Sequence, residues 1–446
     1  MEVTNTMRRK AVFASVVGSL LEWYDFFLYA VIAAIIFNKQ YFPTNDPFVS
    51  NMLAWGSVAV AHFSRPIGGF IFGHFGDRVG RKSMLMITLL IMGFSTVLIG
   101  CLPTYNQIGI WSPILLITLR TFQGIGLGGE WGGAVLLTYE YATPKTRCFY
   151  GSLTQLGLSL CMFLASGIVG LLTIMMDDAS FQSWGWRIPF WISVVMLAVG
   201  WYVRVSVMET PDFQKVQEKR QTGQQQHKIP LVELMTKHGK QAWAGFLARG
   251  IGGVGFNIMA TYIIVYLTQI MLVPRDSALL AVNVGTVFLT LMIPISGWLA
   301  DKYGGMKVFI IGCFIEGICG FPIFYLITHS QGSVFMACVG LAIYLGLIHG
   351  IVSGLSPSFY SSMFPAHVRY TGISFTFMFA NVFFAGATPM IALTLVRMND
   401  NQPWLLCSYI LFIGMISTVA GLWIKKDKER REAEEASNVS IEHQTT

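Results

Sequence analysis

The chain has 446 residues, of which 54% are hydrophobic and only 12% charged, and its mean hydropathy is +0.58. Soluble domains carry about 25% charged residues, so this composition excludes a soluble enzyme and predicts a protein that crosses the membrane several times. The formal net charge of +7 raises nucleic acid as a partner, but the positions of the charges favour a topological explanation. Seven cysteines, an odd number, argue against a disulfide framework.

Apolar runs of about 20 residues predict twelve transmembrane helices. They cover 11–37, 51–75, 84–101, 112–139, 149–175, 186–205, 241–267, 278–300, 307–327, 333–361, 370–396 and 404–424. With twelve spans, both termini and the even-numbered connections lie on one side, which holds 23 of the 30 Lys and Arg residues against three on the other. The positive-inside rule therefore predicts that both termini are cytoplasmic.

A sequence repeat divides the chain into two halves. The motif "GHFGDRVGRK" (73–82) follows the second span and "GWLADKYGGMK" (297–307) follows the eighth, so Asp77 corresponds to Asp301. Arg147 and Arg369 correspond in the same way after the fourth and tenth spans. We expect an N-terminal six-helix bundle (1–205), a cytoplasmic loop (206–240), a C-terminal bundle (241–424) and a cytoplasmic tail (425–446). Parallel repeats of this kind place the substrate at the midplane between the bundles.

These motifs resemble those of a known transporter family. "GHFGDRVGRK" and "RTFQGIGLGGEWGGA" (120–134) are similar to signatures of the major facilitator superfamily. Together with "LLEWYDFFLY", "WGWRIPF" and "METPDF", they resemble the metabolite:proton symporter family. The resemblance covers essentially the whole chain. It implies the all-α major facilitator fold and a solute that is an organic acid, such as citrate, α-ketoglutarate or shikimate, or a zwitterion such as proline or betaine.

The first predicted helix carries two carboxylates, Glu22 and Asp25, in the stretch "GSLLEWYDFF". A charged group facing lipid at this depth is costly, so such groups face protein or water. Their spacing predicts one polar stripe with Ser15, Gly18 and Tyr29, which we expect to face the cavity. Two buried carboxylates this close favour holding a proton, which predicts a coupling site. The alternative is a structural role in ion pairs with arginines.

Two arginines are the candidate substrate contacts. Arg120 shares a stripe of the fourth helix with Gln123 and Glu130. Gln123 is a further candidate substrate contact, and Glu130 is a third candidate for proton coupling. Arginine stays charged and binds carboxylates through two parallel hydrogen bonds. The resemblance also implies a coupling role for Arg120, and a buried ion pair is the alternative.

Arg249 lies on the seventh helix before "GIGGVGF", whose glycines allow a bend. With Asn257 and Tyr262 it is predicted to form the substrate face of the C-terminal half, while Tyr29 contributes from the first helix. His62 is interpreted as a structural histidine whose hydrogen bonds are satisfied, although it could relay protons. Glu316 and His349 are interpreted as isolated structural polar groups.

The repeated loop motif predicts a cytoplasmic gate. Asp77 suits a helix N-terminus, where the helix dipole favours negative charge, and the resemblance implies that this contact latches the two halves. The second copy keeps Asp301 but has "GGMK" in place of "GRK", so its latch is expected to be weaker. The candidate gate residues are Arg65, Gly73, Asp77, Arg78, Gly80, Arg81, Asp301, Arg147 and Arg369.

The sequence therefore favours a proton-coupled importer of a small organic acid, working by alternating access as a multi-pass monomer of the bacterial inner membrane. The proton would be its only coupling partner, with no organic cofactor or metal. A proline/betaine-type symporter and, less strongly, a drug:proton exporter are the alternatives within transporters. A transport-inactive sensor or a membrane enzyme is the alternative of another class, but no nucleophile elbow, metal-ligand cluster or Walker motif is present.

Overall fold

A computed structural model describes residues 5–79, 81–128, 138, 142–143, 145–206, 230–330, 332–365 and 368–445. These residues form helices, turns and loops and no strand, as the all-α prediction requires. Eight helices of the described chain are long and apolar enough to cross a membrane. The predicted second, third, fourth and sixth spans correspond to α3, α4, α6 and α11, which gives the twelve-span order.

The N-terminal half forms six spans between the predicted inner and outer ends of the molecule. The first span runs through α1, η1 and α2, and the fifth runs through α8 and α9, while α5 and α10 are short helices in connections. The elements are α1 (Asn5–Ile32), η1 (Ala33–Phe37), α2 (Asn38–Gln40), α3 (Pro47–Val79), α4 (Arg81–Cys101), α5 (Tyr105–Ile108), α6 (Trp111–Gly126), α8 (Arg147–Leu153), α9 (Leu156–Met175), α10 (Asp178–Ser183), η2 (Gly185–Arg187) and α11 (Ile188–Ser206).

The C-terminal half repeats this arrangement, but its helices are interrupted more often by π-helical turns, which are frequent at functional sites. The glycine-rich segment 250–255 lies in the seventh span, as part of a helix that continues into the π-helical η3. The elements are α13 (Pro230–Lys237), α14 (Gly239–Ala248), α15 (Gly250–Phe256), η3 (Asn257–Tyr262), α16 (Ile263–Val265), η4 (Tyr266–Ile270), α17 (Arg275–Tyr303), α18 (Gly305–Thr328), α19 (Val334–Leu341), η5 (Ala342–Ile348), α20 (His349–Ser361), α21 (Arg369–Ala380), η6 (Asn381–Gly386), α22 (Thr388–Met398) and α23 (Trp404–Thr445).

Two polar segments contain more helix than their composition suggested. Part of the predicted loop 206–240 forms α13, and α23 continues from the last span through the tail. The tail helix carries successive pairs of opposite charge one turn apart, including Lys425–Glu429 at 3.6 Å and Lys428–Glu432 at 3.7 Å. Such pairs stabilise an exposed helix by a few tenths of a kcal/mol each, which favours helix where no apolar face exists.

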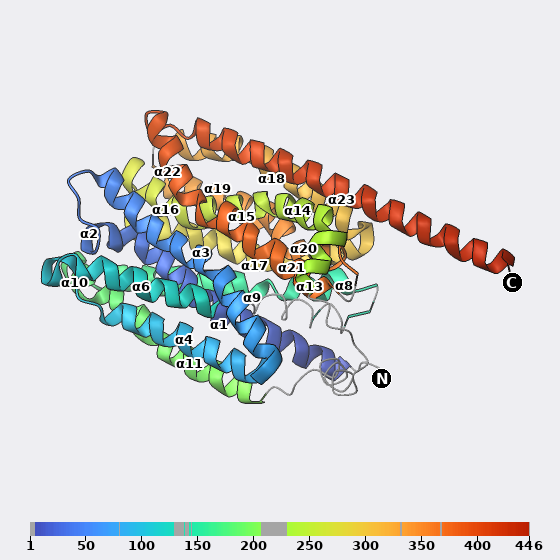
Figure 1. Ribbon diagram of the computed structural model, residues 1–446. Coiled ribbons are helices and arrows are strands. Elements are labelled where there is room, and N and C mark those ends of the chain that lie inside the picture. The colour runs from blue at the N-terminus through green and yellow to red at the C-terminus, as the bar shows by residue number, and fades with distance from the viewer. Residues whose placement is uncertain are drawn as a thin grey trace.

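The two halves lie side by side, with the blue-to-green helices forming one bundle and the yellow-green-to-red helices the other (Figure 1). Within the N-terminal bundle, glycines allow α3 and α6 to touch. A Cβ added at Gly124 would come within 2.5 Å of the Ala61 carbonyl oxygen, so a side chain there would force the helices apart. Between the bundles, α17 packs against α8 and α9, and α3 packs against η6 and α22.

Candidate functional site

A small cavity of about 30 Å³ lies between the two halves. This volume holds only about two or three water molecules, so the cavity has to expand before it can hold an organic solute. The N-terminal half contributes mainly rings, and the C-terminal half contributes most of the polar groups. The lining residues are Trp23, Phe26, Phe27, His62, Leu158, Arg249, Gly252, Gly253, Phe256, Asn257, His349, Ser353, Asn381 and Ala385.

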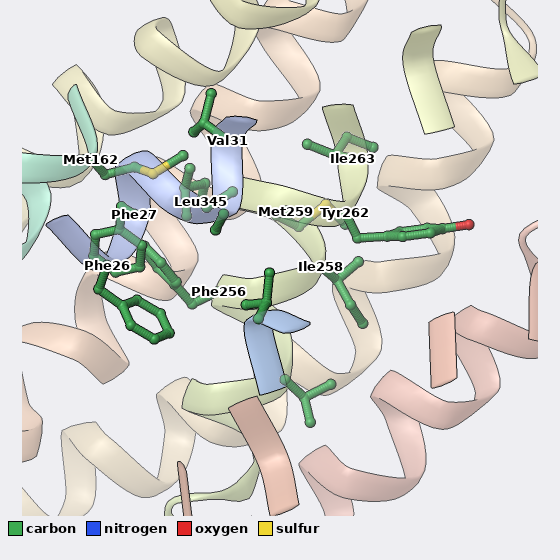
Figure 2. Close-up of a cluster of buried hydrophobic side chains, with 14 of the residues drawn as sticks. Phe26, Phe27, Val31, Met162, Phe256, Ile258, Met259, Tyr262, Ile263 and Leu345 are labelled. Atoms are coloured by element: carbon green, nitrogen blue, oxygen red, sulfur yellow. The ribbon is translucent and has the colours of Figure 1, made fainter. Parts of the chain in front are cut away.

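The outer end of the molecule is closed over the cavity by contacts between the halves. Asp46 meets Arg397 at 3.3 Å and Asp178 meets Arg275 at 3.4 Å. The Asn51 side-chain amide also donates a hydrogen bond of 2.8 Å to Gln269. Below these polar contacts, Phe26 and Phe27 of α1 lie beside Phe256 of α15 in an apolar cluster (Figure 2), with the Phe27 and Phe256 ring centroids 5.2 Å apart.

At the inner end, Asp301 makes a polar contact between the two halves. Its carboxylate accepts hydrogen bonds from the backbone N–H groups of Cys148 and Phe149, both at 2.9 Å. These amides begin α8, where the helix dipole favours negative charge. This is the type of contact that the sequence predicted for Asp77, made here by the second copy of the motif. Arg147 starts α8 and Arg369 starts α21, as their places in the repeat require. Whether the second latch is the weaker one stays a prediction.

The acidic pair of helix α1 is buried, but it does not face the cavity. Glu22 and Asp25 are 3% and 5% exposed. Trp23, Phe26 and Phe27 form the cavity face instead. The expected polar stripe is rotated away from that face by roughly a third of a turn, given about 100° per residue. The expectation that the stripe faces the cavity was therefore wrong, because the interior of a six-helix bundle also shields polar groups from lipid.

Asp25 belongs to a hydrogen-bond network inside the N-terminal bundle. Its carboxylate accepts a hydrogen bond of 2.9 Å from Ser193 of α11 and also contacts Thr96 of α4. Gln123 donates to the Thr96 hydroxyl at 2.6 Å and accepts from Arg120 at 2.9 Å. The network therefore joins Arg120 of the fourth-helix motif to Asp25 of the first helix through neutral side chains.

Aromatic rings separate the arginines of the N-terminal half from the cavity. The Arg120 guanidinium carbon lies 4.6 Å from the Phe26 ring centroid and 4.0 Å from that of Tyr29. Arg65 approaches Phe26 and Trp23 at 4.9 and 4.6 Å, and its charge interacts with Glu22. Arg65 therefore lies behind the cavity wall rather than at the cytoplasmic face, where a gate was predicted. Arg120 does not line the cavity here, so its contact with solute stays a prediction.

Among the other candidate substrate contacts, only two line the cavity. Arg249, between α14 and α15, is 8% exposed and has its guanidinium carbon 5.1 Å from the Phe377 ring centroid. Asn257 begins η3 and donates a hydrogen bond of 2.9 Å to the Gly253 carbonyl. Tyr29 instead donates to Ser57 at 2.7 Å inside the bundle. The ring of Tyr262 extends away from the Phe26–Phe27 pair (Figure 2).

The cavity also contains polar residues outside the predicted substrate face, and the expectation that the hydrogen bonds of His62 are satisfied was wrong. His62 is 2% exposed, and neither of its ring nitrogens has a hydrogen-bond partner in the described part of the chain. Asn381 and Ser353 also line the cavity. Glu316 and His349 are not isolated, as the sequence suggested, but form a buried pair at 2.8 Å. The depth of each polar residue within its predicted span could be derived from the sequence. The partners of these residues on other helices could not.

Several predicted residues cannot be placed in this site. Glu130 and Gly80 lie outside the described residues. The backbone of 73, 77 and 78 belongs to α3 and that of 81 to α4, while the side chains of Asp77, Arg78 and Arg81 lie outside what the structure describes. The first copy of the predicted latch is therefore untested.

Twelve spans in two repeated bundles, with a cavity between them, define a secondary transporter of the major facilitator superfamily. The chain belongs to the family described as sugar (and other) transporter, whose model matches residues 10–425. The xylose transporter XylE of E. coli, solved in a partially occluded inward-open conformation, has the same fold with a TM-score of 0.71. It is 18% identical and the match covers 95% of this chain and 98% of that one.

Relatives at higher identity confirm the metabolite:proton symporter group within the superfamily. The chain is 36% identical to the shikimate transporter of Escherichia coli K12 over 425 residues, or 95% of each protein. It is 40% identical to the inner membrane metabolite transport protein YhjE of the same organism over 392 residues, covering 86% and 87%. It is 31% identical to the proline/betaine transporter of that organism over 453 residues, covering 98% and 89%. The protein is therefore a multi-pass inner-membrane transporter and not an enzyme.

Proposed function

We propose that this transporter is a proton-coupled importer of a small organic acid, with a mono-, di- or tricarboxylate or a shikimate-like compound as the solute. The observation that carries the proposal is the polar wall that the C-terminal half presents to the cavity. Arg249 supplies a permanent positive charge there, beside the amides of Asn257 and Asn381. A buried guanidinium attracts a carboxylate strongly because little water is present to screen the two charges.

In this proposal the proton is carried in the N-terminal half, at Asp25 with Glu22 beside it. Asp25 is buried and bonded to neutral hydroxyls, so it can gain or lose a proton without breaking an ion pair of its own. The network through Thr96 of α4 and Gln123 of α6 connects that change to Arg120 and to these helices, which we expect to move during transport. Proton and solute then occupy separate places, one inside a bundle and one between the bundles.

A zwitterion such as proline or betaine is the second candidate. The proline/betaine relative supports it, and so do the rings of Trp23, Phe26 and Phe27 on the cavity wall, because aromatic faces attract a cationic ammonium group. A drug:proton exporter of the same fold is a weaker alternative. The direction of solute movement under an inward proton gradient separates it from both importers.

The test is uptake by liposomes that contain the purified protein, with an inward proton gradient imposed. The panel is shikimate, citrate, α-ketoglutarate, proline and glycine betaine. We expect one or more of the acids to accumulate above its external concentration and to stop doing so when a protonophore is added. Accumulation of only proline or betaine would replace the organic-acid proposal by the zwitterion proposal. Accumulation that ignores the protonophore would overturn proton coupling.

A further inference from the structure

A buried acid–histidine pair lies at the wall of the cavity in the C-terminal half. His349, the first residue of α20, lines the cavity, and its Nδ1 is 2.8 Å from Oε1 of Glu316 in α18. The two residues are 2% and 0% exposed. The second carboxylate oxygen, Oε2 of Glu316, has no hydrogen-bond partner among the described residues. The pair is therefore enclosed, and one of its polar atoms lacks a hydrogen bond. Burying such an atom costs free energy, so its presence calls for an explanation.

Two glycines of α15 give this pair and Arg249 the space they occupy. The Glu316 carboxylate lies directly against Gly255, where any Cβ would collide with it. A Cβ at Gly252, which lines the cavity, would come within 2.5 Å of Nη1 of Arg249. The charges of Glu316 and Arg249 consequently act on one another across one helix face.

The other titratable groups near the pair are neutral side chains. Tyr344 of η5 and Cys313 and Cys319 of α18 feel the charge of Glu316. Tyr360 of α20 acts on Arg249, Cys407 of α23 acts on Tyr344, and His62 of α3 lines the same cavity. Glu316, Arg249 and His349 therefore set the charge of this part of the cavity in the described structure.

The charge of these three groups depends on one proton. With Glu316 ionised and His349 neutral, the acid balances Arg249 and the site has no net charge. One added proton leaves the site with a charge of +1, which a single carboxylate neutralises. Because an uncompensated charge in a buried site is strongly unfavourable, proton and carboxylate favour each other's binding.

We propose that Glu316 and His349 form a second proton site, which takes up one proton when the carboxylate of the solute binds beside Arg249. In the empty site, Nδ1–H of His349 donates to the Glu316 carboxylate, and Nε2 keeps a lone pair that repels an anion. A proton from solution then bonds to Nε2, and the new N–H donates to the solute carboxylate while Glu316 stays ionised behind the ring. His349 contacts the solute, and Glu316 is a positioning residue that acts through it.

This inference rests on the proposed transport of an organic acid, and it assigns a different role from that of Asp25. The C-terminal pair links the proton to solute binding, whereas Asp25 links it to the conformational cycle. A purely structural reading treats the pair as a tie between α18 and α20. The variant Glu316→Gln separates these readings, because a glutamine can accept the same hydrogen bond from Nδ1–H but carries no charge.

The experiment measures the dissociation constant of shikimate, or of the panel acid that binds best, from pH 5.5 to 8.5 with purified full-length protein. In the wild type we expect the constant to rise by up to tenfold per pH unit on the alkaline side, as linkage to one proton requires. In Glu316→Gln we expect a change of less than about threefold over the whole range, because Arg249 then lacks its counter-charge and attracts the anion without a proton. His349→Gln should bind weakly at every pH.

One matched control keeps the outcomes distinct. Glu316→Asp keeps the charge and should retain the pH dependence. If Glu316→Gln shows the wild-type slope, the second proton site is refuted while the proposed function stands. If no acid of the panel binds to the wild-type protein, the proposed function fails and this inference fails with it. If Glu316→Gln does not fold, the comparison of Glu316→Asp with His349→Gln decides: equal slopes refute the proposal.

Discussion

The two halves of this transporter share a repeated scaffold but present different chemistry to the cavity between them. The N-terminal half turns Trp23, Phe26 and Phe27 toward the cavity and keeps its two acids inside its own bundle. Each half places one histidine on the wall, but Arg249 of the C-terminal half is the charged residue there. A repeat therefore predicts where helices lie, while the function of each half depends on which face of a helix carries its polar residues.

The largest effect should come from the acid of the N-terminal half. Asp25→Asn keeps an oxygen that can accept the Ser193 hydrogen bond but removes the titratable proton. We expect accumulation against a gradient to be lost completely, with the inside-to-outside ratio of solute falling to about one, while exchange of solute across the membrane continues. Asp276→Asn, at an exposed position in the first turn of α17, is the matched control. Undiminished accumulation in Asp25→Asn and also in Glu22→Gln would remove the N-terminal half from proton coupling.

The next effect concerns the contact that joins the two halves at the inner end. Asp301→Asn weakens two hydrogen bonds from the start of α8 to a charged acceptor, which are worth about 1.5–3 kcal/mol each when buried and less at this half-buried position. We expect the inner end to open more often. Cys148, which lies at the contact, should then react roughly tenfold faster with a thiol reagent, which corresponds to a change of about 1.4 kcal/mol in the free energy of opening.

Solute affinity in Asp301→Asn should stay within about twofold of the wild type, since the contact is remote from the cavity wall. Asp276→Asn, at the other end of the same helix α17, is the control. An unchanged reactivity of Cys148 together with a large loss of solute affinity would show that Asp301 acts on the cavity rather than on the closure.

The fold and part of the site followed from the sequence for physical reasons that can be named. The lengths of the apolar runs predicted the twelve spans. The preference of a carboxylate for a helix N-terminus predicted the type of contact that Asp301 makes. The burial of Glu22 and Asp25 was correctly expected. Of the predicted substrate face, Arg249 and Asn257 line the cavity and Tyr262 does not.

The remaining features depend on contacts between helices. The spacing of residues in a single sequence does not predict which side chains of different helices meet. Polarity showed that Asp25 avoids lipid, but it could not distinguish the bundle interior from the cavity between bundles. The pairing of Glu316 with His349 joins two helices, and each residue alone appeared isolated. The screening of Arg120 by Phe26 and Tyr29 depends on how two helices are rotated relative to each other.

The smallest effect should come from the outer ion pair that joins the halves. The Phe48 backbone N–H, followed by the Arg397 guanidinium, holds the pKa of Asp46 below its ordinary value. Asp46 therefore favours the closed, folded state above the ordinary aspartate pKa of about 4, and this contribution is lost as the pH falls through the lowered value.

Asp46→Asn should consequently change thermal stability slightly at pH 7 and progressively less as the pH falls below about 4, because exposed pairs contribute little. Arg397→Gln is the partner variant. A thermal-unfolding difference from wild type that grows on acidification would contradict the sign of this account.

The division of labour between the halves is tested most directly by solute titrations of two matched arginine variants. Arg249→Lys and Arg120→Lys both keep a positive charge and both lose the planar fork that holds a carboxylate. The measurement is the dissociation constant of the best-binding organic acid for each variant and for the wild type. The account predicts a loss of about 10- to 150-fold for Arg249→Lys, as expected for one charge-assisted contact, and less than about threefold for Arg120→Lys. Equal losses would contradict it, and would mean that Phe26 moves aside and Arg120 holds the solute together with Arg249.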